Sequence, residues 1–410
     1  MIKTAPSSVA FVVSGMRILC SILFFKVLST FAQNWQQLPD FPGTARDDAA
    51  AFSYYCKVYV GTGLQVGWSA TNDWWQYDVV QYTWQQVASL PATPRQYSTA
   101  VAIDGTGYLF GGLDATAPLS ELWAYDTAAD EWNARTSLPA AGRYACASFT
   151  ANGKLYIVGG LIAGGTALNE LWEYDPTNDQ WSQRSSLPGT PRHRATATRL
   201  NQWDNTQALV IGGADSAYVA LDEVWKYTAP ADQWEQMVSF PEARYGASSA
   251  THDGVVVMAG AVNDTTFRND AYMGEAWAPF GELPSNRRGG VMGYSDCPGW
   301  FYVLYGTGID DDFVRHNDWY MNGYGFSIPE NGLAPLALYP NPAQDRLTLQ
   351  LPSAWQQASL TITESSGRLV MTVPYQAGSA LSILDLAPGM YAIAAEHNGQ
   401  RVPGFFTKLP

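Results

Sequence analysis

The sequence predicts an all-β protein in which six repeated units precede a second, smaller β domain. A tryptophan recurs with a spacing of 43 to 53 residues, and each copy is followed by Leu-Pro or Phe-Pro, an arginine, a glycine-containing pair and an aromatic strand. Units of this length bury their apolar faces only by stacking on their neighbours, in a ring or an array. The recurring tryptophans are Trp35, Trp84, Trp132, Trp181, Trp234 and Trp277.

The third unit shows the strand pattern most clearly. The run from Lys154 to Val158 is almost wholly apolar, which is typical of a strand covered on both faces. It ends at Gly159-Gly160, where a side chain would clash with a neighbouring strand. The next run, 171–175, is aromatic and bounded by turn formers. The other units repeat these marks, most weakly the fifth, whose pair is Ala259-Gly260 and whose aromatic strand holds Tyr272 without a following aspartate.

These motifs resemble the kelch repeat, and six copies in register resemble a six-bladed kelch-type β-propeller. The resemblance covers residues 33–327. It implies that the strand of Trp35 completes the last blade beside Trp319-Tyr320. Such a closure joins the two ends of the ring and removes open sheet edges.

Residues 1–32 are typical of a secretory signal peptide. Arg17 precedes an apolar run over 18–28, and small residues stand at 30 and 32, the spacing of a cleavage site. A membrane anchor is the disfavoured alternative, because the run is short and contains Lys26.

A linker over 328–335 leads to alternating short strands in residues 336–410. This tail resembles the C-terminal sorting domain of the type IX secretion system; without the resemblance it would be a small β-sandwich of unassigned binding role. The sorting motif consists of Tyr339, Pro340, Asn341, Pro342, Gly389 and Tyr391. The resemblance implies the type IX secretion machinery as a partner and a secreted or cell-surface protein.

The formal net charge is −14, and the excess of acidic residues lies in the repeats. Nucleic acid and anionic membrane surfaces are therefore disfavoured as partners. We expect a monomer without a transmembrane span in the mature chain.

The cysteines leave two alternatives open. Cys56 and Cys297 fall near equivalent turns of the first and sixth units, so a disulfide could link them, but buried free thiols are favoured. No Cys-x-x-C or Cys/His cluster supports zinc, and the few histidines do not form a copper site like that of galactose oxidase. We expect Asp310-Asp311-Asp312 to be a solvated loop rather than a calcium site. We expect no metal or cofactor.

Each unit places an arginine at the start of its innermost strand, so the sequence predicts guanidinium groups facing one mouth of the channel. Arginine suits planar capture of carboxylate or phosphate. The alternative is a structural role in every blade, bound to loop carbonyls or to acids such as Asp47 and Asp48. The candidate ligand-binding residues are Arg46, Arg95, Arg143, Arg192, Arg244 and Arg287, with Tyr97, Tyr144, His193, Arg194, Tyr245 and Arg288 beside them.

We expect a binding or interaction module for a carbohydrate or protein ligand rather than an enzyme. The enzymatic alternative comes from the exported kelch-type N-acetylneuraminate epimerases, which share the implied architecture. In that alternative His193 or Glu242 would be the general acid or base, although no motif marks either. A purely structural surface protein is the third possibility.

Overall fold

The computed structural model describes residues 35–200, 205–251, 254–295, 302–323, 336–340, 343–364, 369–398 and 400–409. The expected signal peptide, the linker, Cys297, and Asn341 and Pro342 of the sorting motif lie outside these residues. Within the described ranges no helix is long and apolar enough to cross a bilayer.

Between Trp35 and Gly323 the described strands form six four-stranded antiparallel sheets. We call each sheet a blade and number the blades by the order of their innermost strands. The strands of blades one to three, innermost first, are β3 (Ala50–Tyr54), β4 (Lys57–Gly61), β6 (Trp74–Asp78) and β7 (Thr83–Val87); β8 (Thr99–Ile103), β9 (Thr106–Phe110), β10 (Leu122–Asp126) and β11 (Glu131–Arg135); and β12 (Ala147–Ala151), β13 (Lys154–Val158), β14 (Leu171–Asp175) and β15 (Gln180–Arg184). The all-β propeller architecture is confirmed.

The strands of blades four to six follow the same order: β16 (Thr196–Arg199), β17 (Gln207–Ile211), β18 (Val224–Thr228) and β19 (Gln233–Gln236); β20 (Ser248–Thr251), β21 (Val255–Asn263), β22 (Thr266–Met273) and β23 (Ala278–Arg287); and β24 (Val291–Tyr294), β25 (Tyr302–Gly306), β26 (Trp319–Gly323) and β1 (Gln36–Leu38). A 3₁₀ turn, η1 (Ala229–Ala231), precedes β19, and the short strands β2 (Arg46–Asp47) and β5 (Leu64–Gln65) pair with each other.

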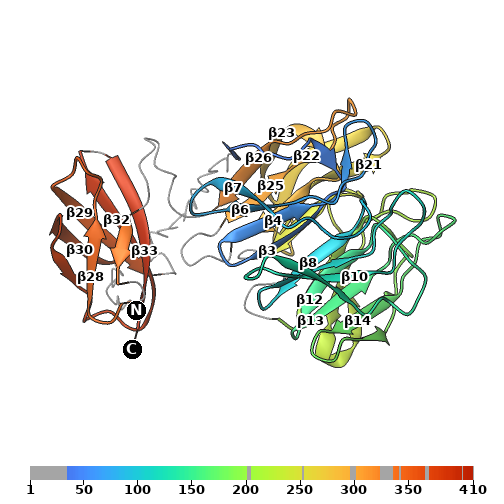
Figure 1. The fold of residues 1–410 in the computed structure, drawn as a ribbon, viewed down its shortest axis with the longest axis horizontal. Coiled ribbons are helices and arrows are strands. Elements are labelled where there is room, and N and C mark those ends of the chain that lie inside the picture. Colours follow the sequence, from blue (N-terminus) through green and yellow to red (C-terminus); the bar gives the residue numbers. More distant parts are fainter. Residues whose placement is uncertain are drawn as a thin grey trace, which may run out of the picture. The chain divides into compact units, whose positions relative to one another are not determined.

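The innermost strands contact one another in a closed cycle from β3 through β8, β12, β16, β20 and β24 back to β3. Figure 1 shows β3, β8 and β12 following one another at the inner side of their sheets. Just before these strands, one residue per blade donates its backbone N–H to the carbonyl of the previous blade, over 2.8 to 3.0 Å. This central ring consists of Asp48, Tyr97, Ala145, Arg194, Gly246 and Gly289, all with left-handed φ.

The strand after Trp35 completes the last blade, as expected. Gln36 to Leu38 in β1 pair with Met321 to Trp319 in β26, so the two ends of the propeller chain share one sheet. The edge of β26 is thereby covered, which stabilises the closed form.

The recurring tryptophan joins blades one to five to the blade before them by an indole hydrogen bond, whereas the Trp35 indole N–H of blade six has no hydrogen-bond partner among the described residues. In blade three the Trp181 indole N–H donates to the Thr136 carbonyl at 2.8 Å, while the Asp179 carboxylate accepts the Thr136 N–H at 3.0 Å. Tyr174 donates to the same carboxylate and packs on the Trp181 ring. Equivalent indole bonds come from Trp84, Trp132, Trp234 and Trp277.

The fifth blade is complete despite its weak motif. Its β21 and β22 are longer than the equivalent strands elsewhere and continue into a bulged hairpin. This hairpin replaces the open loop that the other blades place after the glycine pair.

The tail has two sheets, in the orders β27-β28-β31 and β30-β29-β32-β33. Its strands are β27 (Ala337–Tyr339), β28 (Arg346–Gln350), β29 (Gln357–Glu364), β30 (Leu369–Gln376), β31 (Ala380–Ser382), β32 (Gly389–His397) and β33 (Gln400–Lys408). Side chains such as Leu347 and Leu360 from the two sheets share one core. Tyr391 packs inside against Phe406 and donates to the Ala387 carbonyl, whereas Tyr339 is exposed.

Candidate functional site

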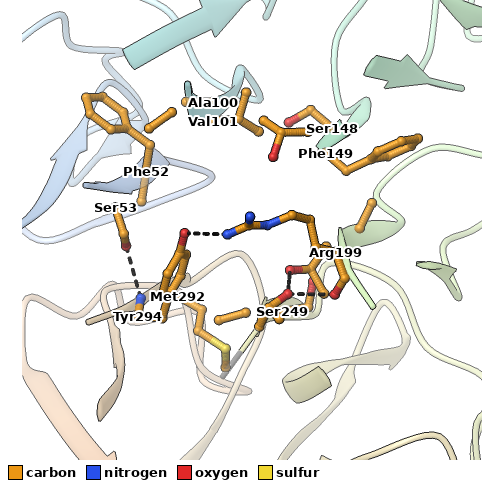
Figure 2. A pocket seen from close by; sticks show the side chains of 17 residues that line it. Phe52, Ser53, Ala100, Val101, Ser148, Phe149, Arg199, Ser249, Met292 and Tyr294 are labelled. Atoms are coloured by element: carbon orange, nitrogen blue, oxygen red, sulfur yellow. Dashed lines mark hydrogen bonds between the residues drawn. The ribbon is translucent and has the colours of Figure 1, made fainter. Parts of the chain in front are cut away.

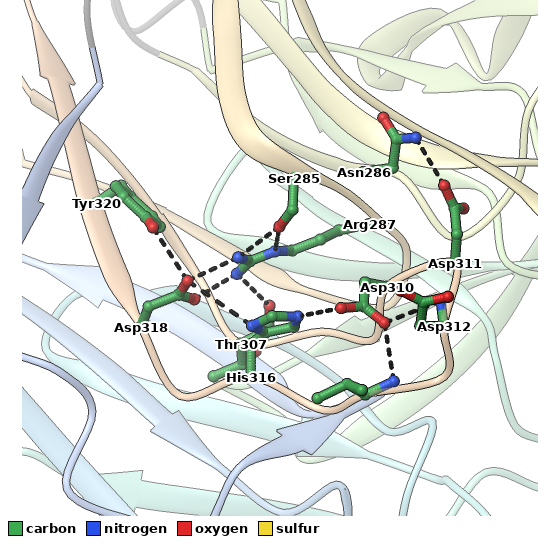
Figure 3. Close-up of polar contacts among 11 residues, drawn as sticks. Ser285, Asn286, Arg287, Thr307, Asp310, Asp311, Asp312, His316, Asp318 and Tyr320 are labelled. Carbon is green, nitrogen blue, oxygen red and sulfur yellow. Dashed lines mark hydrogen bonds and ion pairs between the residues drawn. The ribbon is translucent and has the colours of Figure 1, made fainter.

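The recurring arginine of each blade is buried and bound to a carboxylate at the start of that blade's third strand. The pairs are Arg46–Asp73, Arg95–Glu121, Arg143–Glu170, Arg192–Glu223, Arg244–Asp270 and Arg287–Asp318. Figure 3 shows Arg287 held by Asp318 and by the Ser285 hydroxyl, with a further bond to the Thr307 carbonyl at 3.3 Å.

This geometry corrects the expectation that the guanidinium groups face the channel mouth. The six arginines are at most 2% exposed. In most blades the aromatic residue two positions after the acid donates to the same carboxylate, as Trp172 does to Glu170 at 2.9 Å. The guanidinium and carboxylate groups therefore pair with each other inside each blade. This agrees with the alternative that the recurring arginines have a structural role.

The first glycine of the pair makes room for the arginine of the next blade. A Cβ on Gly159, where φ is +70°, would lie 2.4 Å from the Arg192 carbonyl oxygen, and one on Gly160 would meet Cys146 Sγ at the same distance. Gly159 thus lets the next blade approach, whereas Gly160 makes room for the residues that precede the first strand of its own blade.

The channel has a mouth on the side of the loops between second and third strands. Four charged residues meet there, which we call the arginine–aspartate cluster: Asp47, Asp48, Arg288 and Arg315. Arg315 donates to Asp47 at 2.5 Å, and Arg288 lies 3.8 Å from both aspartates. Burial and the adjacent Asp48 raise the pKa of Asp47 to about 7, against the lowering influence of the arginines.

A second group surrounds Arg194 and contains four of the expected site residues. The Arg194 guanidinium donates to the Tyr97 hydroxyl at 2.5 Å and lies over the rings of Tyr97 and Tyr245. Tyr97 also contacts the Tyr144 ring at 5.8 Å. Because Arg194 belongs to blade four and Tyr97 to blade two, this bond crosses the central ring. We call these residues the tyrosine cluster.

His193 lies beside this cluster as a buried, neutral imidazole. Its Nε2 faces the Asp215 carbonyl at 3.2 Å, so Nε2 carries the proton and Nδ1 has no hydrogen-bond partner among the described residues. Burial and the nearby Arg194 lower the pKa of His193 to about 4. It is therefore uncharged at neutral pH.

Glu242, the other expected acid or base, is bound by two arginines. Arg268 contacts both of its oxygens at 2.6 and 2.7 Å, and Arg244 lies at 3.1 Å. These bonds, chiefly that from Arg268, lower the pKa of Glu242, which stays ionised at neutral pH.

The Asp310-Asp311-Asp312 loop uses its carboxylates internally (Figure 3). Asp310 accepts the Val314 N–H and contacts His316, both at 2.8 Å, while Asp311 accepts from the Asn286 side chain at 2.6 Å. Within the described part of the chain, no group of three or more His, Cys, Asp or Glu side chains could hold a metal ion.

Three aromatic side chains stand at the rim of the mouth: Trp68, Tyr218 and Phe313. They occupy the same position of equivalent turns, with φ of 65°, 62° and 60°, and are 74%, 44% and 52% exposed. The equivalent residue of blade three is Gly165. Bulky residues avoid this left-handed region, so the three aromatic residues are held in strained backbone.

The rim is continuous with the charged centre of the mouth. Arg315 lies over the Trp68 ring at 4.6 Å, and Tyr218 packs on His193 at 4.7 Å. Phe313 meets Phe267, whose ring also lies under Arg288. Sequence reasoning missed the rim because these residues lie in loops of variable length outside the repeated motif; their one signal is an aromatic residue where a turn favours glycine.

Comparison with known families agrees with this architecture. The KLHDC2/KLHL20/DRC7 kelch-repeats domain matches residues 16–202, the Attractin/LZTR1 beta-propeller matches residues 134–273, and the secretion system C-terminal sorting domain matches residues 337–403. The chain contains kelch-repeat propeller domains and a type IX sorting domain. That tail directs the kelch propeller to the cell surface or the extracellular space.

Individual relatives are similar over short stretches. The chain is 39% identical over 59 residues to N-acetylneuraminate epimerase 1 of Escherichia coli O6:H1, an alignment covering 14% of each chain. It is 34% identical over 83 residues to N-acetylneuraminate epimerase of Yersinia enterocolitica, covering 20% of this chain and 19% of that one. The chain thus spans less than a quarter of the length of these relatives.

The solved structure of YjhT shares the fold. Its TM-score is 0.58 at 20% sequence identity, and the alignment covers 69% of this chain and 96% of that one.

Proposed function

We propose that the protein is a cell-surface carbohydrate-binding module whose ligand contacts the mouth of the propeller. The observation that carries this proposal is the set of three exposed aromatic residues in left-handed backbone at equivalent turns. Strain of this kind costs about 1 to 3 kcal/mol per residue and is concentrated at functional positions.

The chemistry of the mouth fits a sugar. Flat aromatic faces pack on the apolar faces of sugar rings, and a few polar groups fix the orientation of a bound ligand. Arg288, whose side chain is 15% exposed, is the most accessible group of the arginine–aspartate cluster for that role. A protein ligand is the alternative occupant, because aromatic and arginine side chains also dominate protein interfaces.

The proposal is tested by glycan-array binding of the full chain, followed by titration of any sugar that binds. Trp68→Asn and Phe313→Asn each remove one ring and place there a residue that tolerates left-handed backbone. We expect each to weaken binding at least tenfold. Tyr55→Asn is the matched control, because Tyr55 is also exposed, with φ of 55°, but lies in a turn between first and second strands. Unchanged binding in both rim variants, or binding of proteins alone, would contradict the proposal.

A second candidate function is sugar epimerisation, which one further observation favours. Besides the N-acetylneuraminate epimerases among the relatives, the mouth holds Asp47, whose pKa of about 7 suits proton transfer near neutrality, beside Arg288 and Arg315. NMR of N-acetylneuraminate with the protein would detect a change of configuration. Activity lost in Asp47→Asn supports this candidate, and none in the wild type excludes it for this sugar.

A further inference from the structure

The end of the channel opposite the mouth holds a cavity that the proposed function does not use. Its inner part is lined by the first strands of all six blades and has a volume of about 100 Å³ (Figure 2). Its outer part, of about 390 Å³, lies beside the turns between first and second strands and is also lined by Asp104. The two parts share Ser53, Ala102, Thr150, Arg199 and Tyr294. We call the two parts together the channel cavity.

The central ring separates the channel cavity from the mouth. Its backbone hydrogen bonds narrow the channel, and the bond from Arg194 to Tyr97 crosses it. The small pocket at the ring shares no lining residue with the inner part of the channel cavity. A ligand of this cavity therefore enters from the opposite face of the propeller.

The wall of the inner part is a mosaic of small apolar side chains and hydroxyl groups. The hydroxyl-bearing residues of blades one, three, four and five are Ser53, Ser148, Thr150, Thr198, Ser249 and Thr251. Several are paired across blades, such as Thr198 with Thr251 at 2.6 Å. Each hydroxyl has two acceptor lone pairs and one proton, so a paired hydroxyl can still bind a ligand.

One charged side chain, Arg199 of blade four, lines the inner part of the cavity. Its guanidinium donates to the Tyr294 hydroxyl of blade six at 3.1 Å, and Figure 2 shows it reaching across the cavity toward that residue. Among the described residues no carboxylate lies within ion-pairing distance of Arg199, whereas every recurring arginine has one. That Arg199 has no ion pair within the described ranges is notable in a chain of net charge −14.

We propose that the channel cavity is a second binding site, for a small hydroxylated carboxylate such as a hexuronic acid. Of the Arg199 guanidinium's hydrogen bonds to described residues, the structure shows the one to Tyr294, and the other N–H donors have the planar arrangement that binds a carboxylate through two hydrogen bonds. The serine and threonine wall supplies partners for the ligand's hydroxyl groups. The partial exclusion of water from the channel strengthens the ionic contact.

The test is calorimetric titration of the full chain with glucuronate, with glucose as the neutral analogue and sulfate as the bare anion. We expect glucuronate to bind at least tenfold more tightly than glucose or sulfate. Arg199→Gln should weaken glucuronate binding at least tenfold, whereas Arg194→Gln, on the mouth side of the ring, should leave it within threefold. Tyr294→Phe frees a donor of Arg199 and should keep or improve the affinity, even if Arg199→Gln misfolds.

Several results would overturn the proposal: no binding of glucuronate, equal binding of glucose or sulfate, or wild-type affinity in Arg199→Gln. Loss of binding in Arg194→Gln alone would assign the sugar acid to the mouth. Trp68 and Phe313 do not line the channel cavity. The glucuronate titrations therefore test the cavity proposal separately from the mouth proposal, which the Trp68→Asn and Phe313→Asn variants test.

Discussion

At the scale of single residues, the aromatic residues of the rim adopt an unfavourable backbone conformation. Trp68, Tyr218 and Phe313 adopt the left-handed conformation that Gly165 adopts at the same turn position. A left-handed residue other than glycine costs about 1 to 2 kcal/mol. Since these side chains are largely exposed, burial offsets little of that cost.

We therefore expect Trp68→Asn to leave the free energy of unfolding unchanged or to raise it by about 1 kcal/mol, although a large side chain is removed. The reverse change, Gly165→Trp, is the matched comparison: a Cβ at Gly165 meets no atom within 4 Å, so its cost should be backbone strain alone. Denaturant unfolding measures both. A loss of several kcal/mol in Trp68→Asn would show that the ring supports the fold instead.

The buried His193 makes the free energy of unfolding depend on pH. Its pKa is about 4 in the folded protein and about 6.5 when unfolded, so the unfolded state binds more protons between these values. The free energy of unfolding should fall as pH drops from about 6.5 to 4, by up to about 3 kcal/mol from this group. His193→Gln keeps a donor for the Asp215 carbonyl and removes the titration. Its stability relative to wild type should rise between pH 7 and pH 4.5 in urea unfolding; a constant difference would contradict this.

At the scale of the blade, each residue type of the repeated motif makes one defined contact. Tryptophan binds the previous blade, arginine binds the acid of its own blade, and the first glycine of the pair admits the next blade. These three contacts explain why the motif recurs once per unit.

Arg143→Ala should therefore destabilise the fold instead of altering a ligand site. The change leaves Glu170 with only its Trp172 contact and removes a fully buried side chain. Breaking a buried ion pair costs roughly 3 to 5 kcal/mol, and partial exposure of Glu170 places the expected value near the lower end. Arg135→Ala, at an exposed position in the same repeat, should change stability by less than about 0.5 kcal/mol. Equal small effects in thermal unfolding would exclude the structural role.

The sequence predicted the strands, their order and the closing role of β1, because each depends on a local pattern repeated in every unit. Tyr97, Tyr144, His193 and Arg194 follow the same motif, and the structure brings them close together; their role in binding a ligand stays a prediction. The sequence could not show that the recurring arginines turn into their blades, because position along the chain does not give side-chain direction. The rim and the Arg199–Tyr294 contact depend on loops and residues far apart in sequence.

At the scale of the whole molecule, closure of the ring has more than one support. The strand β1 lies in the last blade, and the central ring links neighbouring blades by backbone hydrogen bonds. Cys56, in the turn between β3 and β4, is disulfide-bonded, and Cys146 is a free buried thiol. The expectation of free thiols was therefore wrong for Cys56; the partner lies outside the described residues.

We expect that partner to be Cys297, because Cys20 belongs to the predicted signal peptide. A bond between these cysteines would link blade one to blade six. It would close a loop that contains most of the propeller chain, and a disulfide reduces the entropy of the unfolded chain more when the loop it closes is longer. Peptide mapping of the exported protein without reduction should recover one peptide pair containing Cys56 and Cys297. Cys56→Ser should lower the free energy of unfolding by about 2 to 4 kcal/mol. Cys146→Ser is the control: peptide mapping of this variant should still recover the disulfide-linked pair, because Cys146 is a free thiol. A map that joins Cys56 to Cys146 would contradict this assignment, and an unchanged melting temperature in Cys56→Ser would show that the ring closes without the bond.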